Sequence, residues 1–264
     1  GAFINSTNPG VVYGGLKTDL GDMKKLIVNG VDVQMRFWPG SAEFLLVKQA
    51  SITADLRVKI LDARLDVCKV TPRPEVLVAQ NQMLYKQPAL YPYTRTRLHT
   101  FNVKTGTAFV SEDDIFNGEV PQRVYIGFVS DTAFKGSLTK NPFYFKNIGM
   151  TEVTLYVNDM IVNGHSLRLD FPKKEFSEGY ERLLVVRGHD LDPERGLNIT
   201  YNEFKDGYTI IGYETDGGIV PDDVLHFIRK GNMRLEVKCT ATTEDLIGVV
   251  YAEFPDVFQI DAAR

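Results

Sequence analysis

The chain has 264 residues, of which 44% are apolar and 24% are charged. This composition is typical of a globular protein and excludes disordered, collagen-like and disulfide-scaffold classes. The formal net charge of -4 argues against a domain whose whole surface follows nucleic-acid phosphates, so no specific nucleic-acid partner is expected. Because no apolar run reaches about eighteen residues, and the start lacks a charged region followed by an apolar stretch, the sequence predicts neither a membrane span nor an export signal.

The first seventy residues carry strand-like alternation. In 31–37, apolar and polar residues alternate strictly, and Asn29-Gly30 follows the short apolar run 26–28; together they predict a hairpin. In 56–70 the apolar positions change phase by one residue, from Leu56, Val58 and Ile60 to Leu61, Ala63, Leu65 and Val67. A phase change of this kind predicts a β-bulge or a crossing between sheets.

Thr71-Pro72-Arg73-Pro74 interrupts this pattern, because proline lacks a backbone donor and restricts the residue before it. We therefore expect a domain boundary near residue 71. Residues 75–93 show no clear periodicity. Strand patterns resume after them and recur between turn residues, which is typical of an all-β sandwich or barrel; they cover Arg95–Val103, Arg123–Val129, Glu152–Val157, Ser166–Leu169, Tyr208–Tyr213, Met233–Thr240 and Leu246–Phe254.

Only two segments have a helical pattern. Phe176, Tyr180, Leu183 and Leu184 share one face at helical spacing. The second expected helix begins at Pro221-Asp222-Asp223 and ends at Arg229-Lys230-Gly231, with acids in its first turn and bases in its last.

The sequence carries no motif that specifies catalysis. His99, His165, His189 and His226 share no metal-ligand spacing. The alternating acids of 189–196 resemble a calcium loop, but Arg195 occupies the position that requires glycine, so a solvated loop is favoured. We therefore assign no catalytic, cofactor-binding or metal-binding residue, and expect a protein that is not an enzyme.

The two cysteines, Cys68 and Cys239, lie in alternating apolar runs, which predicts buried free thiols. Three consecutive aromatics, Phe143-Tyr144-Phe145, cannot all face one core. They indicate an interface, a carbohydrate platform, or a loop that closes one end of a sandwich, and physical reasoning favours the loop. The bases of 57–73 alternate with acids, which favours a solvated face over a nucleic-acid patch.

Five segments of the sequence carry a family resemblance: Leu26–Gln34, Ala133–Asn147, Lys205–Tyr213, Gly231–Lys238 and Val250–Phe254. In this order they resemble the double jelly-roll major capsid proteins of Polinton/Maverick elements and adintoviruses. The resemblance runs from about Leu16 to Asp261, and its most specific part is the block Asn141-Pro142-Phe143-x-Phe145.

The resemblance implies a structural protein whose trimers form pseudo-hexameric capsomers of an icosahedral double-stranded DNA virus or virus-like transposon. The expected partners are other copies of the protein and minor or penton capsid proteins. The expected location is the virion, assembled inside the host cell. The chain is similar to the second half of such a protein: 1–70 resemble the closing strands of a first jelly roll that is largely absent, and 71–264 a C-terminal jelly roll.

Two other classes remain open. A carbohydrate-binding β-sandwich has the same fold class and exposed aromatics, and ligand-dependent stabilisation by glycans identifies it. A hydrolase built on a sandwich requires a histidine-centred cluster with a nucleophile within hydrogen-bond reach.

Overall fold

The computed structural model describes residues 10–21, 23, 25–48, 56–188, 197–215 and 227–263. Its helices are α1 (Ala42–Leu45), α2 (Pro74–Leu84), α3 (Asp131–Phe134), the short η1 (Val162–Gly164), α4 (Ser177–Arg187) and α5 (Tyr201–Lys205). Its strands are β1 (Ala89–Val103), β2 (Phe109–Glu112), β3 (Glu119–Val120), β4 (Arg123–Ser130), β5 (Met150–Val157), β6 (Met160–Ile161), β7 (Leu167–Arg168), β8 (Ile210–Glu214), β9 (Arg229–Lys230), β10 (Met233–Cys239) and β11 (Leu246–Ile260).

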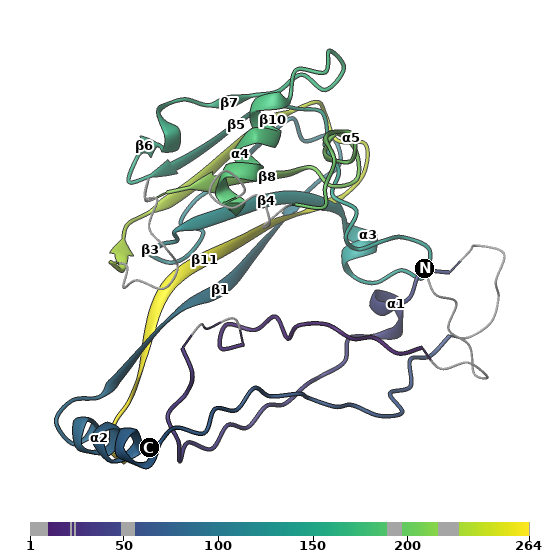
Figure 1. The fold of residues 1–264 in the computed structure, drawn as a ribbon. Coiled ribbons are helices and arrows are strands. Elements are labelled where there is room, and N and C mark those ends of the chain that lie inside the picture. Colours follow the sequence, from purple (N-terminus) through teal and green to yellow (C-terminus); the bar gives the residue numbers. More distant parts are fainter. Residues whose placement is uncertain are drawn as a thin grey trace.

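The strands form an antiparallel jelly-roll sandwich (Figure 1). The first sheet has the order β1-β11-β4-β8, and the second has the order β2-β10-β5-β6, with β7 also paired to β5. The chain crosses repeatedly from one sheet to the other, so the first long strand, β1, lies beside the last, β11, along its whole length. This is the double-sheet arrangement of a jelly roll, and it confirms the predicted fold class.

The core lies between the two sheets and follows the alternation of the sequence. On β10, Met233, Leu235 and Val237 are at most 1% exposed, whereas Lys238 of the same strand is exposed. The seven strand segments predicted between residues 95 and 254 all contain strands of the sandwich, although β7 keeps only two residues and β1 and β11 extend further than predicted. The turn residues Asn158 and Asp159 both have positive φ, and they join β5 to β6.

Helix α4 forms where one apolar face was predicted, and it packs on β8 of the first sheet. Gly212 of β8 makes this close approach possible, because a Cβ there would lie 3.3 Å from the Leu183 backbone. Helix α2 lies in the segment where no regular structure was predicted. It starts at Pro74, a residue suited to the first turn of a helix. The proline pair that predicted a domain boundary therefore stands at the start of a helix.

The second predicted helix is wrong at its C-terminal end, because Arg229 and Lys230 form β9, which pairs with β3. The two basic residues, which predicted the last turn of a helix, instead pair in a β-ladder with Glu119 and Val120. The start of that predicted helix, at 221–223, lies outside the described residues, as does the acidic loop 189–196.

The hairpin predicted around 31–37 and the strands predicted in 56–70 are also wrong for this chain. Gly30 does adopt the positive φ of the expected turn, but neither run forms a ladder within the described residues. Their apolar side chains remain exposed, as at Phe37 (65%) and Val67 (65%). Cys68 is likewise exposed and not buried as predicted, while Cys239 is buried and both thiols are free. Alternation alone does not make a strand, because each strand needs a neighbour to accept its backbone hydrogen bonds.

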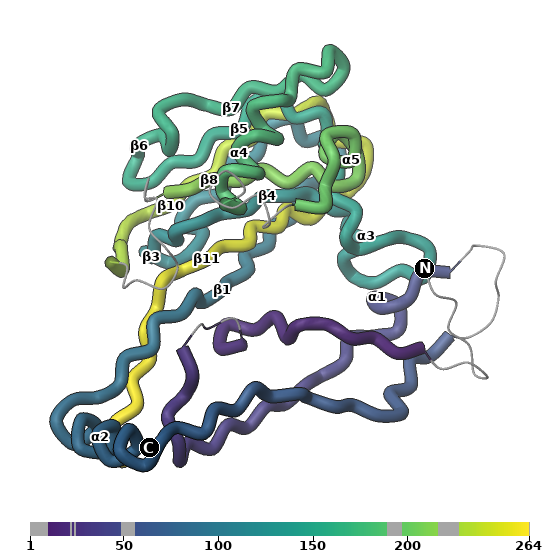
Figure 2. Tube along the Cα trace, in the orientation of Figure 1, coloured from purple at the N-terminus to yellow at the C-terminus, as the bar shows by residue number. Residues whose placement is uncertain are grey.

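Strands β1 and β11 extend beyond the rest of the sandwich. Residues 89–94 of β1 pair with 255–260 of β11, whereas β4 pairs only with 246–253. The resulting two-stranded ribbon leads to α2 (Figure 1). Figure 2 traces 10–48 and 56–73 as long extended stretches apart from the sandwich, with α1 as their one short helix among the described residues.

Candidate interaction surfaces

The outer face of the first sheet carries an uncovered apolar surface. Leu98 of β1, Tyr251 of β11 and Tyr125 of β4 are neighbours across the three strands. Leu98 is 58% exposed and Tyr251 is 38% exposed. Helix α4 covers the β8 side of this sheet and α3 the other end of the strands, so the exposed row lies between them.

This surface forms the floor of a groove of about 500 Å³. We call it the sheet groove. Its walls come from distant parts of the sequence, because α1 contributes Phe44, the loop before β5 contributes Phe143 and Phe145, and α4 contributes Leu183 and Arg187. A groove of this size with mainly apolar walls is suited to binding an apolar partner.

Two residues of the aromatic triplet, Phe143 and Phe145, line one wall of the sheet groove. Phe145 packs over Gly127, where a Cβ would lie 2.6 Å from its ring. The Tyr144 hydroxyl donates to Asp206 at 2.8 Å, and Phe143 packs edge-on against Phe44 with ring centroids 5.6 Å apart. The triplet is therefore part of a structured loop, as favoured from the sequence, with Phe143 still 57% exposed.

The outer face of the second sheet has the opposite character. Lys238 of β10 pairs with Glu152 of β5 at 2.9 Å. The Arg234 guanidinium lies 4.4 Å from the centre of the Tyr156 ring, and Glu236 accepts a hydrogen bond from the Tyr156 hydroxyl at 3.3 Å. Charged pairs of this kind are satisfied in water. The exposed apolar side chains of this face, Phe109 and Ile161, lie apart on β2 and β6, with β10 and β5 between them.

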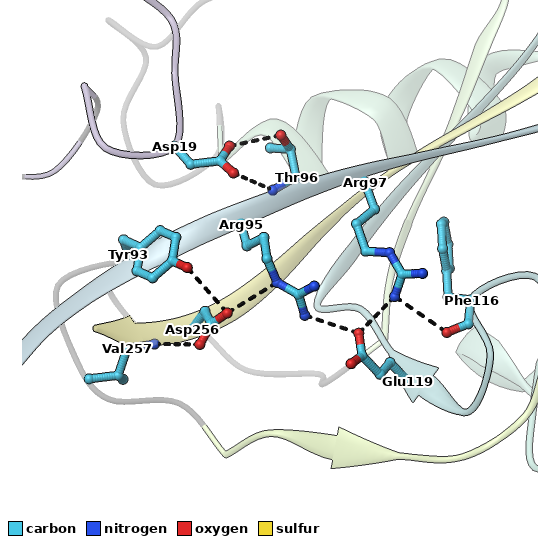
Figure 3. A network of polar contacts seen from close by, with 9 residues as sticks. All are labelled: Asp19, Tyr93, Arg95, Thr96, Arg97, Phe116, Glu119, Asp256 and Val257. Atoms are coloured by element: carbon cyan, nitrogen blue, oxygen red, sulfur yellow. Dashed lines mark hydrogen bonds and ion pairs between the residues drawn. The ribbon is translucent and has the colours of Figure 1, made fainter. Parts of the chain in front are cut away.

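The extended residues before α2, 10–48 and 56–73, are called the N-terminal stretch. This stretch contacts the first sheet and its loops at three places. Asp19 accepts hydrogen bonds from the Thr96 hydroxyl at 2.8 Å and from the Thr96 backbone at 3.3 Å (Figure 3). The Val28 backbone donates to the Tyr91 hydroxyl at 3.0 Å. The third place is the contact of Phe44 with Phe143, next to a backbone bond from Lys48 to Leu138 at 2.6 Å.

Charged residues join the ribbon to the sandwich on the other face of β1. Arg95 bridges Glu119 at 3.0 Å and Asp256 at 3.1 Å, and Arg97 reaches Glu119 at 2.8 Å (Figure 3). Burial opposes ionisation of Glu119, but hydrogen bonds from the two arginines hold the pKa of its carboxyl below the ordinary value. This network fixes β3 against β1 and leaves no unpaired carboxylate in it for catalysis.

His165, Glu178 and Arg182 form a cluster that the sequence analysis did not identify. Glu178 Oε1 lies 2.9 Å from His165 Nε2 and 2.6 Å from the Arg182 guanidinium, which itself lies over the buried Tyr213 ring. Burial opposes ionisation of Glu178, yet hydrogen bonds from His165 and Arg182 lower the pKa of its carboxyl. The i,i+4 spacing of Glu178 and Arg182 was the available sequence signal. The cluster ties the loop before β7 to α4, and the Ser177 hydroxyl beside it forms a hydrogen bond with the Tyr201 hydroxyl at 3.0 Å.

Among the described residues, no group of three or more potential ligands is placed to hold a metal ion. His99 instead meets Glu112 at 3.0 Å, and His189 and His226 lie outside the described residues. No helix in the part of the chain that the structure describes is long and apolar enough to cross a membrane.

Comparison with known proteins gives a sequence relative that is itself uncharacterized and weak likeness to solved structures. No protein-family model matches the sequence. An uncharacterized protein of Caenorhabditis elegans is 25% identical over 273 residues, an alignment that covers 99% of this chain and 64% of the relative; the chain thus spans less than two thirds of that protein. A solved structure described as the PBCV-1 virus capsid, a quasi-atomic model, is similar with a TM-score of 0.36 and 12% identity, covering 69% of this chain and 52% of that one.

Proposed function

We propose that the protein is a structural capsid protein of the double jelly-roll type, whose trimers form pseudo-hexameric capsomers of an icosahedral particle around double-stranded DNA. Residues 71–264 are the C-terminal jelly roll, and 1–70 contribute closing strands to a first one. The capsid is that of a Polinton/Maverick element or an adintovirus, whose major capsid proteins the sequence resembles. The virion is the location, with assembly inside the host cell.

One observation carries the proposal: a complete jelly-roll sandwich has an uncovered apolar face on one sheet and a charged, solvated face on the other. Large uncovered apolar surfaces mark interaction sites. A double jelly-roll subunit needs apolar contacts between its two sandwiches and no catalytic group, and closed symmetry turns one repeated contact between subunits into a shell. The motif Asn141-Pro142-Phe143 supports the same function, because two of its residues line the sheet groove.

The proposed binding partners are other copies of the protein and minor or penton capsid proteins. The net charge of -4 is compatible with a shell whose genome contacts are made by other proteins or by a small inner patch. The exposed alternating runs 31–37 and 56–70 fit strands that are completed by residues of another sandwich.

The test is to express the complete reading frame that encodes this chain and to image the purified product by electron microscopy, with its mass measured by light scattering. We expect six-lobed trimeric particles. The variant Tyr251→Asp, on the apolar face, should abolish them, while Lys238→Asp, on the charged face, should retain them.

A monomeric product that forms no particles contradicts the proposal. Thermal stabilisation of such a monomer by glycans supports the alternative, a carbohydrate-binding β-sandwich module, because a ligand that binds only the folded state raises the melting temperature.

A further inference from the structure

The two sheets of the sandwich differ in what their outer faces require. On the second sheet, the outward residues of β10 find partners within the same face, such as Glu152 for Lys238 at 2.9 Å. On the first sheet, Leu98 and Tyr251 are side by side across β1 and β11 and remain 58% and 38% exposed. The exposed apolar residues of the second sheet, Phe109 (52%) and Ile161 (38%), lie apart on β2 and β6, with the charged residues of β10 between them. The first sheet instead leaves a contiguous apolar row in water, at a cost of about 25 cal/mol for each Å² of apolar surface that stays exposed.

The N-terminal stretch is attached to this same side of the molecule. Thr96 is two residues from Leu98, so their side chains lie on one face of β1, and Thr96 is bonded to Asp19. Phe44 also lies in the wall of the sheet groove, against Phe143. The stretch therefore contacts the first sheet beside Leu98 and contributes to the groove wall, while Leu98 and Tyr251 remain exposed.

The same stretch carries two strand patterns, 31–37 and 56–70, that form no β-ladder with the described residues. Val33 and Phe37 in 31–37 are 52% and 65% exposed, and Ile60 and Leu65 in 56–70 are 64% and 50% exposed. Backbone donors and acceptors of an extended run are satisfied by neighbouring strands. The C. elegans relative is longer than this chain, which spans 64% of it, and a polypeptide of that length has room for such strands.

We propose that the outer face of the first sheet is the face on which a second β-sandwich of the same polypeptide packs, with 31–37 and 56–70 among the strands of that sandwich. This inference rests on the proposed function and adds to it the surface that joins the two sandwiches. Leu98, Tyr251 and the sheet groove are the centre of the contact, and Phe44 is its edge. The charged face of the second sheet is not part of it.

The test compares the accessibility of two matched positions. Leu98→Cys probes the first sheet, and Phe109→Cys, at a residue of β2 that is 52% exposed, probes the second sheet. Both are made with Cys68→Ser, which removes the exposed native thiol. Maleimide labelling is measured in the 264-residue chain and in the product of the complete reading frame. We expect labelling of Leu98→Cys to be at least about tenfold slower in the complete product, because the thiol then reacts only when the contact opens. Labelling of Phe109→Cys should be unchanged.

Equal labelling rates for Leu98→Cys in the two proteins overturn the inference. Hydroxyl-radical footprinting of the unsubstituted proteins at Leu98, Tyr251 and Phe109 gives the same comparison if a variant fails to fold. The proposed function fails separately: protection of Leu98 without six-lobed trimers keeps the packing surface and rejects the capsomer, whereas trimers with an exposed Leu98 keep the capsomer and reject this surface.

Discussion

Tyr213 connects the two sheets through a single buried hydroxyl. Its side chain is fully buried on β8, and its hydroxyl donates to the backbone oxygen of Val153 on β5 at 2.9 Å. Burial raises the pKa of this hydroxyl far above its ordinary value, so it stays a donor. Tyr213→Phe should therefore lower the free energy of unfolding by about 1–3 kcal/mol, because the Val153 oxygen loses a partner in the core.

Denaturant unfolding measures this change. The matched control is Tyr85→Phe, whose side chain is 82% exposed and whose effect should stay within about 0.5 kcal/mol. Equal effects of the two variants would show that the Tyr213 hydroxyl does not stabilise the sandwich.

Gly248 is required by the ring of Phe101. A Cβ at Gly248 would lie 2.7 Å from Cε1 of Phe101 and closer still to two other ring carbons. Gly248→Ala should lower the unfolding free energy by about 1–3 kcal/mol through overpacking. Adding Phe101→Leu should make the combined loss smaller than the sum of the two single losses, since residues in contact are coupled. Gly15→Ala, where no atom lies within 4 Å of the added Cβ, is the control, and strict additivity would contradict the explanation.

Asp245 gives the fold a dependence on acid pH. The backbone N–H of Thr105, the Lys104 ammonium and the Thr105 hydroxyl all donate to its carboxylate, and they lower its pKa from 3.8 to about 2. A pKa that is lower in the folded state stabilises the protein fully above 3.8, and this contribution is lost as the pH falls towards 2.

Asp245→Asn should therefore lower the melting temperature at neutral pH, and the difference from the parent protein should disappear as the pH approaches 2. Calorimetry across this range measures it. Asp62→Asn, in the exposed run 56–70, is the control. A melting difference for Asp245→Asn that persists unchanged at pH 2 would exclude the carboxylate as its cause.

At the scale of elements, the sequence predicted the strands whose partners lie in this chain. The alternation of β10 was read correctly because β2 and β5 flank it on both sides. The equally regular alternation of 31–37 gave the wrong result, since pairing depends on a neighbour that a local pattern does not specify. Helix α2 was missed because its apolar residues follow no clear stripe, and only Leu84 is buried.

The phase change in 56–70 also makes this run self-complementary. If two copies pair antiparallel about a point between Asp62 and Ala63, Val58 lies opposite Val67, Ile60 opposite Leu65, and Lys59 opposite Asp66. In this register each even-numbered residue lies opposite an odd-numbered one. The apolar residues are even-numbered up to Ile60 and odd-numbered from Leu61, so the change of phase places Val58 and Ile60 opposite apolar residues. Cross-strand pairs of this kind each contribute up to about 1 kcal/mol.

Lys59→Asp should therefore weaken self-association of the 264-residue chain, because it creates two like-charge pairs per dimer. At about 1 kcal/mol for each pair, the dissociation constant should rise about thirtyfold. Adding Asp66→Lys should restore association, and sedimentation equilibrium measures all three proteins. Failure of the double variant to recover would exclude this register.

At the scale of the whole molecule, the sheet groove was the least predictable feature. Phe143 was singled out in the sequence as a surface aromatic, but its neighbours Phe44, Leu98 and Tyr251 come from segments that the fold alone brings together. Each is an unremarkable apolar residue in its own run. What distinguishes them is that no element covers them, and coverage is a property of tertiary structure that periodicity does not encode.

The oligomeric state of the 264-residue chain follows from these surfaces. A six-lobed trimer of the proposed kind requires two complete sandwiches in each subunit, whereas the described residues form one sandwich and leave 31–37 and 56–70 outside any β-ladder. The chain should therefore not form that trimer. We expect monomers together with dimers that associate through the exposed runs, because unpaired strand edges recruit other chains. Size exclusion with light scattering and small-angle X-ray scattering distinguishes the two cases. A stable six-lobed trimer of the 264-residue chain would show that one sandwich per subunit is sufficient and would refute the division at residue 71.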